Sequence, residues 1–346
     1  MALKEYVNVD IYKLDIFRNA KSVSKDTPVS LKQLECLLDN AVYRVYYSDD
    51  KTIANKDNML DKFSDGGGDF PDAYIGYCEF DSDMNATKVI VKGMGIPMST
   101  FSGNTDITEC EIIGDIPYIE DNAFQNCINL ESINIPDSVT YLGEKAFYQC
   151  YDLELTKLPD GLTSIKTYAF YCCEKIALTE LPSGITSIGD YAFQNCYVLA
   201  LTELPDGITS IGYQAFRNCY ALALTELPDG VTSIGSNAFY GCTNLALTKL
   251  PSSLTKIDYD VFHDCTNLAL TEIPSGITSI SYTAFQNCTN LTSMTFKGTP
   301  SSISSSAFSG CTNLVDIKVP WSSGDVSGAP WGATNATITY DYVPAV

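Results

Sequence analysis

Apolar residues return along this chain at a fixed spacing of 23 residues. A phenylalanine marks the spacing, a cysteine follows it three residues later, and an aliphatic residue stands five residues before it. A repeat of this length is too short to bury its own apolar side chains, so the pattern predicts a solenoid in which each coil covers the next. The repeated phenylalanines are Phe124, Phe147, Phe170, Phe193, Phe216, Phe239, Phe262, Phe285 and Phe308.

Each repeat contains three recognisable segments. The segment "LALTELP" is short, rich in Leu and Thr and closed by Pro, which predicts one strand of a parallel sheet. After a turn at "PDG" or "PSG", the segment "GITSI" predicts a second short extended stretch. The segment "DYAFQNC" (190–196) predicts a helical or 3₁₀ turn, because its Ala-Phe pair packs inward between polar residues.

The repeat fades toward both ends, as the capping of a solenoid requires. Upstream, Phe101 keeps the register while Asn104 replaces the cysteine. Downstream, Val326 and Trp331 fall on the aliphatic and phenylalanine positions, and "NATITY" predicts a last strand. We therefore expect a solenoid of about ten repeats over residues 84–346.

Residues 1–83 do not follow the 23-residue spacing. The stretch "TPVSLKQLECLLDN" predicts an amphipathic helix capped by Ser30. The stretches "AVYRVYYS" and "AYIGYCEF" predict strands, with the loop "DGGGDFPD" between them. These elements predict a small α+β domain or an enlarged N-terminal cap.

The repeat "LxxIxLPxxVTSIGxxAFxxCxxL" resembles the BspA-like subclass of bacterial leucine-rich repeats, and Val319–Tyr340 resembles the closing segment of such proteins. The resemblance covers about three quarters of the chain. It implies an α/β repeat fold, a curved leucine-rich-repeat solenoid with a parallel β-sheet. It also implies a role in binding, often on bacterial surfaces and sometimes in phage-related proteins, with no catalytic residues. The central repeats depart from it, because Thr179 and Thr202 stand where Ile133 stands in an earlier repeat. Which strand side chains point inward there is left open.

The charge of the chain limits its partners. With 42 acidic against 21 basic residues the net charge is −21, which argues against nucleic acid and against an anionic membrane surface. No apolar run approaches the length of a membrane span. The opening "MALKEYVNVDIYKLDIF" lacks the pattern of a secretory signal, so we expect either a mature form or another export route. The expected location is extracellular or on the bacterial surface, with a phage virion or the cytoplasm as alternatives.

Cysteine and histidine do not indicate a metal, a cofactor or a catalytic centre. The closest cysteines, Cys172 and Cys173, are adjacent and point differently, so we predict buried, reduced thiols that fill space. His263 is the only histidine, and Gln, Tyr and Arg take its place in other repeats, which predicts a tolerated surface residue. We expect no enzyme, although a glycan-active hydrolase would remain an alternative if carboxylates clustered in a cleft.

Two sets of variable or exposed positions are candidate binding residues. The first is rich in tyrosine, which gives contact area at low entropic cost, although neutral variation at exposed turns gives the same composition. The second follows the predicted strand and makes an acidic strip for a basic or hydroxyl-rich ligand, or else a solvated face that prevents aggregation. The first set is Tyr168, Tyr191, Tyr197, Tyr213, Tyr220, Tyr259 and Tyr282, and the second is Glu180, Glu203, Glu226 and Glu272, beside Lys157 and Lys249.

These observations predict a non-enzymatic binding or adhesion protein that presents an extended solenoid surface to a protein or glycan ligand. The alternative is a structural or receptor-binding component of a phage or tail-like particle, with the N-terminal region as its attachment module. The oligomeric state is left open.

Overall fold

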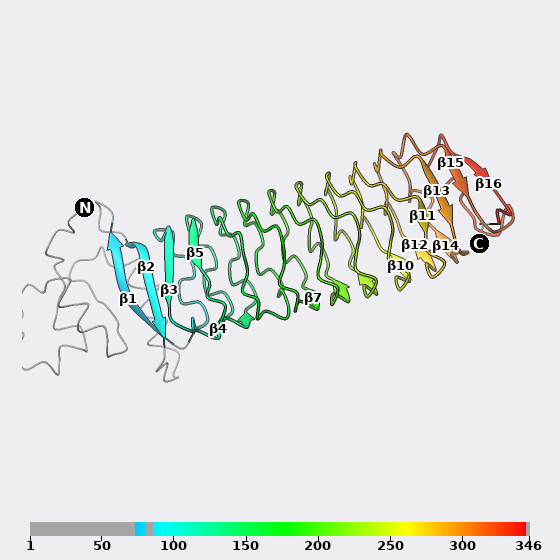
Figure 1. Ribbon diagram of the computed structural model, residues 1–346. Coiled ribbons are helices and arrows are strands. Elements are labelled where there is room, and N and C mark those ends of the chain that lie inside the picture. Colours follow the sequence, from blue (N-terminus) through cyan, green and yellow to red (C-terminus); the bar gives the residue numbers. More distant parts are fainter. Residues whose placement is uncertain (1–72, 81–85, 94, 344–346) are drawn as a thin grey trace, which may run out of the picture. The chain divides into compact units, whose positions relative to one another are not determined.

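The structure is a computed structural model that describes residues 73–80, 86–93 and 95–343. The chain divides into two compact units, Met1–Leu153 and Glu154–Val346. Within each unit successive coils of the chain lie side by side (Figure 1). The described residues form short strands joined by turns, and none of them forms a helix.

The first unit contains a four-stranded sheet and a two-stranded sheet. In the larger sheet β1 pairs antiparallel with β2, and β2, β3 and β5 then run parallel. The sequence prediction of a strand at "AYIGYCEF" is confirmed by β1, whereas the predicted helix and the other N-terminal strand lie outside the described residues. The strands are β1 (Ala73–Phe80), β2 (Ala86–Gly93), β3 (Glu109–Ile113), β4 (Tyr118–Ile119), β5 (Ser132–Asn134) and β6 (Tyr141–Leu142).

The second unit contains three parallel sheets, with strand orders β7-β8-β9, β10-β12-β14 and β11-β13-β15-β16. Partners in these sheets are mostly 23 residues apart, as in the pairs Ser187↔Ser210 and Glu272↔Thr295. The second extended segment of each repeat is thereby confirmed. The strands are β7 (Ser187–Ile188), β8 (Ser210–Ile211), β9 (Ser233–Ile234), β10 (Lys256–Ile257), β11 (Glu272–Ile273), β12 (Ser279–Ile280), β13 (Ser293–Phe296), β14 (Ser302–Ile303), β15 (Asp316–Lys318) and β16 (Thr337–Thr339).

The repeated phenylalanines form the core of the coils. In the second unit the rings from Phe170 to Phe308 stack on one another, with centroids between 5.0 and 5.7 Å apart. In the first unit Phe101 stacks on Phe124 at 4.9 Å. These side chains are almost completely buried. A single coil leaves its ring open to solvent, so the stack confirms that each coil buries the core of its neighbour.

The segment predicted as a strand is not a strand in the central coils of the second unit. Leu178 and Leu181 are buried there, whereas Thr179 and Glu180 between them are both exposed. Two consecutive exposed residues break the alternation that a strand requires. The prediction is therefore wrong for these coils, and the open question of side-chain direction is settled: the leucine points inward and the threonine outward.

The predicted helical or 3₁₀ turn is also wrong. Tyr191 and Asn195 have φ angles of 59° and 61°, which no right-handed helix contains. The N–H groups of Tyr191, Phe193 and Asn195 donate to carbonyls of the next coil instead of to their own turn. The intervening N–H groups donate three residues back. The segment is thus a run of hydrogen-bonded β-turns whose alternate amides tie neighbouring coils together.

The cysteine ladder is buried in the described part of the chain, as predicted, and its thiols form no disulfide there. The thiol of Cys219, for example, donates to the carbonyl oxygen of Phe193 at 3.0 Å, and the same bond recurs along the ladder. Burial raises the pKa of the Cys219 thiol well above its usual range. The thiols therefore act as small, protonated core groups with a hydrogen bond of their own.

Aromatic residues close the C-terminal end of the second unit. Trp331 is fully buried, and its ring centroid lies 6.1 Å from Trp321 and 5.9 Å from Phe296. Val326 is buried at its expected place, and the last strand, β16, lies within "NATITY". The predicted continuation of the repeat through this cap is confirmed.

Candidate functional site

The seven candidate tyrosines lie at the two ends of the turn segment. Five stand one or two residues before the buried Ala-Phe or Val-Phe pair, and we call them the tyrosine edge. Tyr168 and Tyr191 directly precede the pair, and Tyr213, Tyr259 and Tyr282 stand one residue earlier. The other two, Tyr197 and Tyr220, directly follow the buried cysteine. The structure thus separates residues that the sequence analysis treated as one set.

Three residues of the tyrosine edge form a contiguous cluster. The rings of Tyr168 and Tyr191 stack with centroids 4.4 Å apart at an angle of 6°. Tyr213 meets Tyr191 edge-on at 5.1 Å. Tyr168 and Tyr191 are at equivalent positions of neighbouring coils, which lie about 4.8 Å apart, whereas Tyr213 stands one residue earlier in the next coil. The cluster offers ring edges and phenol groups that neighbouring side chains already hold in place.

Hydrogen bonds further fix this cluster. The N–H of Tyr213 donates to Oδ1 of Asp190 at 2.7 Å, and Nε2 of Gln214 donates to the Tyr213 hydroxyl at 2.7 Å. Desolvation, together with the neighbouring phenols of Tyr168 and Tyr213, raises the pKa of Tyr191 to about 12. The Tyr191 hydroxyl is therefore neutral near pH 7 and can both donate and accept hydrogen bonds.

Tyr259 and Tyr282 are the most open members of the tyrosine edge. They occupy the same position in consecutive coils and are 57% and 59% exposed. Within the described residues, no other ring and no cation lies over either of them. Their ring faces are available to a ligand, unlike those of Tyr168 and Tyr191.

The remaining candidate tyrosines form a separate stacked pair. The ring centroids of Tyr197 and Tyr220 are 5.3 Å apart at 11°. Tyr220 is 45% exposed, and desolvation raises the pKa of Tyr197. The two rings of this pair are stacked like those of Tyr168 and Tyr191, but they lie at a different corner of the coil.

The acidic strip borders two adjoining surface depressions. The larger has a volume of about 490 Å³ and includes Glu180 and Glu203 in its lining, and the second extends it past Glu226. Glu226 pairs with Lys249 at 2.9 Å, and Glu272 pairs with Lys297 at 3.2 Å. Glu180 and Glu203 form no ion pair with any described residue. The strip is thus partly neutralised by lysines, and Glu180 and Glu203 carry its unbalanced charge.

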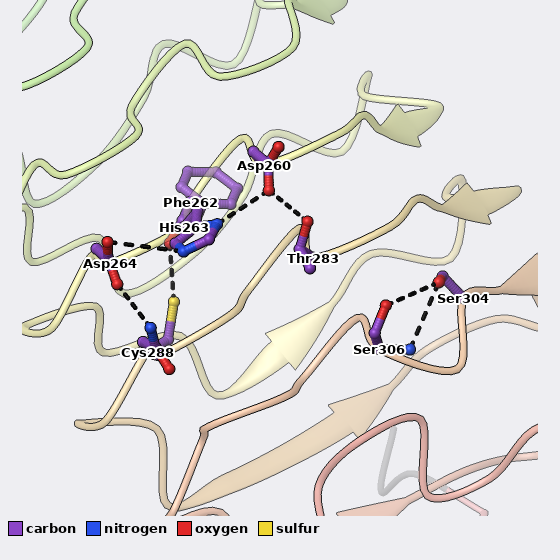
Figure 2. Close-up of polar contacts among 9 residues, drawn as sticks. Asp260, Phe262, His263, Asp264, Thr283, Cys288, Ser304 and Ser306 are labelled. Atoms are coloured by element: carbon purple, nitrogen blue, oxygen red, sulfur yellow. Dashed lines mark hydrogen bonds and ion pairs between the residues drawn. The ribbon is translucent and has the colours of Figure 1, made fainter.

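The sequence analysis missed a cluster around His263, which Figure 2 shows. Its Nδ1 lies 2.9 Å from Oδ1 of Asp260, and its Nε2 lies 3.6 Å from Oδ2 of Asp264. The Thr283 hydroxyl donates to Asp260, and Nδ2 of Asn287 donates to Oδ1 of Asp264 at 2.8 Å. Only 15% of the His263 side chain is exposed, so the expectation of a tolerated surface residue is corrected.

This cluster continues as a column of flat groups along the coils. The Tyr240 ring lies 4.6 Å from the His263 ring, and the Arg217 guanidinium lies 4.4 Å above Tyr240. All three stand at the same repeat position, one coil apart. The 23-residue spacing places these three residues next to one another in the stack of coils. Because an arginine, a tyrosine and a histidine have little in common as residue types, the sequence pattern did not single them out as a group.

Nothing in the described part of the chain gathers three or more His, Cys, Asp or Glu side chains in a way suited to a metal ion. That part of the chain also contains no helix with the length and apolar character of a membrane span.

Comparison with known proteins identifies the repeat. Residues 94–223 and 209–328 match the family model of the BspA type leucine rich repeat region, which occurs in six copies. No curated protein matches the chain.

Several solved structures of bacterial leucine-rich-repeat proteins are similar to this chain. A leucine rich cell surface protein from Faecalibacterium prausnitzii is 24% identical, with a TM-score of 0.34, over 72% of this chain and 94% of its own. A leucine-rich repeat protein from Bacteroides ovatus is 21% identical, with a TM-score of 0.38, over 74% and 84%. The pneumococcal vaccine antigen PcpA is 19% identical, with a TM-score of 0.46, over 71% and 72%. Because the family model covers more than half of the sequence, this chain belongs to the BspA-type leucine-rich repeat proteins.

Proposed function

We propose that this chain is a non-enzymatic binding protein that contacts a protein ligand through its tyrosine edge, in adhesion or recognition at a bacterial surface. The observation that carries the proposal is the stacked cluster of Tyr168, Tyr191 and Tyr213. Side chains that are already ordered lose little entropy on binding. Tyrosine is also one of the residues that dominate the energy of protein interfaces.

The packing of the cluster favours a protein over a glycan. One face of Tyr168 and one face of Tyr191 cover each other, and Tyr213 meets Tyr191 edge-on. What remains for a ligand is a row of ring edges and hydroxyls. Such a row suits the mixed apolar and hydrogen-bonding surface of a protein.

The arrangement around His263 supports binding rather than catalysis. A nucleophilic mechanism requires a hydroxyl or thiol on one ring nitrogen of the histidine. Here carboxylates lie beside both nitrogens, and the Thr283 hydroxyl donates to Asp260 instead. The cluster therefore ties two coils together and does not activate a nucleophile.

The test is an array of purified extracellular proteins and glycans probed with the full chain and two variants. The first variant, Y168A/Y191A/Y213A, removes the cluster. The matched control, Y197A/Y220A, removes the same kind of stacked pair at the other corner. We expect the first variant to lose at least about thirtyfold in affinity for a captured protein, as central interface tyrosines do, and the control to lose little.

Thermal unfolding of both variants separates loss of binding from loss of folding. The proposal fails if the captured ligand binds the first variant as tightly as the unchanged chain. It also fails if every captured ligand is a glycan.

A further inference from the structure

The open pair Tyr259 and Tyr282 has a different chemistry from the stacked cluster. We propose that these two residues bind cationic side chains, arginine above all, of a protein ligand. The inference rests on the proposed function, because it assigns a partner chemistry to one part of the tyrosine edge. It concerns ring faces, whereas the stacked cluster offers ring edges and hydroxyls.

The backbone holds the two tyrosines in a fixed relation. The carbonyl oxygen of Tyr259 accepts the N–H of Asn237 at 2.8 Å, and that of Tyr282 accepts the N–H of Asp260 at 3.3 Å. The Thr283 hydroxyl also donates to the Asp260 carboxylate, next to both tyrosines in sequence. Consecutive coils are about 4.8 Å apart, so one planar guanidinium can lie within cation–π range, about 6 Å, of both rings.

The same unit already shows what a tyrosine face in this protein attracts. The Arg217 guanidinium lies 4.4 Å above the ring of Tyr240, and Nζ of Lys318 lies 5.5 Å from the ring of Tyr342. Tyr259 and Tyr282 are more than half exposed and have no such cation among the described residues. A cation from a partner would complete a contact that the chain makes internally elsewhere.

Charge at this corner also favours a cation. Asp258 and Asp260 flank Tyr259 in the sequence, and each retains part of its surface in solvent. The local positive groups are Lys256, which pairs with Asp258 at 2.7 Å, and His263 when it is protonated. Over the whole chain the net charge is −21. A basic ligand is therefore attracted, and an acidic one is repelled.

Arginine fits better than lysine. The guanidinium is planar and weakly hydrated, and it stacks on aromatic faces while its N–H groups remain free for carboxylates. An arginine over Tyr259 and Tyr282 could donate to a neighbouring aspartate at the same time. Lysine would keep the charge attraction but lose the stacking.

The experiment measures binding of a fluorescent hexa-arginine peptide to the full chain by anisotropy, beside hexa-lysine and an uncharged glycine-serine peptide. We expect hexa-arginine to bind most tightly and Y259A/Y282A to weaken it about tenfold. The conservative variant Y259F/Y282F keeps the ring faces and should stay within about threefold of the unchanged chain. The variant E180Q/E203Q controls for general attraction by removing charge at the acidic strip. Its loss should be smaller and should disappear in high salt.

Equal binding to Y259A/Y282A and the unchanged chain would overturn the inference. So would an equal loss in the alanine and phenylalanine variants, because that would assign the contact to the hydroxyls. The array ligand of the proposed function separates the two ideas. Suppose that Y168A/Y191A/Y213A abolishes binding of the array ligand, while hexa-arginine binds Y259A/Y282A as tightly as the unchanged chain. In that case only the proposed cation site is wrong.

Discussion

The central coils and the C-terminal coils of the second unit bury different residues at equivalent positions. In a central coil Leu201 is buried and Thr202 is exposed. Four coils later the equivalent residues are Ser293, which is half-buried, and Met294, which is fully buried. The inward position has thus moved by one residue. The later segment alternates and forms the strand β13, whereas the central segment forms no strand.

The two kinds of coil nevertheless share the same phenylalanine stack and cysteine ladder. Phe216 and Phe308 are both fully buried, and Cys219 and Cys311 both donate to a phenylalanine carbonyl. The strand is therefore not what sets the 23-residue period. The turn segment, with its inter-coil hydrogen bonds and buried ring, keeps the coils in register, and the strand can be lost without disturbing it.

The strongest test of this comparison is a reciprocal alanine scan. We expect Leu201→Ala and Met294→Ala each to lower the free energy of unfolding by about 2–5 kcal/mol, because each removes a buried side chain. Thr202→Ala and Ser293→Ala should change it by no more than about 0.5 kcal/mol. Urea unfolding followed by circular dichroism measures all four. A large loss for Thr202→Ala, or none for Leu201→Ala, would show that the inward position is the same in both kinds of coil.

The sequence was sufficient for the period and the core of the described coils, because Phe, Cys and Ile recur at one spacing. It was not sufficient for the direction of the "LALTELP" side chains. Leu178 and Thr179 can each point inward in a strand, and only the packing against neighbouring coils decides between them. The family pattern has an inward Ile133 at the second position, and its replacement by threonine in the central coils left the direction open.

The sequence predicted the candidate residues by their composition, and the structure adds which of them contact one another. Tyr191 and Tyr197 look equivalent in the sequence, because both are variable tyrosines near the same phenylalanine. Six residues of turn place them at different corners of the coil, in different stacks. The His263 cluster was missed because its contacts with Asp260 and Tyr240 depend on side-chain directions that the sequence does not give.

The turn segment also differs between central and C-terminal coils, and we expect this difference to change the free energy of unfolding by about 1 kcal/mol. Asn237 has a φ of 58°, whereas Ser306 at the equivalent C-terminal position does not have a positive φ. Alanine is strained in the left-handed region, so Asn237→Ala should lower the free energy of unfolding by about 1 kcal/mol. Asn237→Gly should cost less, since glycine adopts this conformation freely. Ser306→Ala should have almost no effect in the same urea measurement. Equal losses at the two positions would remove backbone conformation as the cause.

The smallest expected effect is a loss of stability at alkaline pH that is caused by the stacked tyrosines. The C-terminal coils lack this stack, because Ser306 stands at the position of Tyr191. Burial and neighbouring phenols raise the pKa of Tyr191 to about 12, against about 10 in the unfolded chain. The folded state therefore holds this proton more tightly than the unfolded state. The contribution to stability is fully present below about pH 10 and is lost as the pH rises toward 12.

Tyr191→Phe removes this titration, so its stability should fall less steeply than that of the unchanged chain between pH 10 and 12. Urea unfolding at several pH values measures the slope, and Tyr282→Phe, at an exposed tyrosine of the same edge, is the matched control. Parallel slopes for the unchanged chain and Tyr191→Phe would mean that the phenol titrates like a free tyrosine. In that case the cluster would be less rigid than its stacking distance of 4.4 Å indicates, and the advantage of a pre-ordered binding surface would be lost with it.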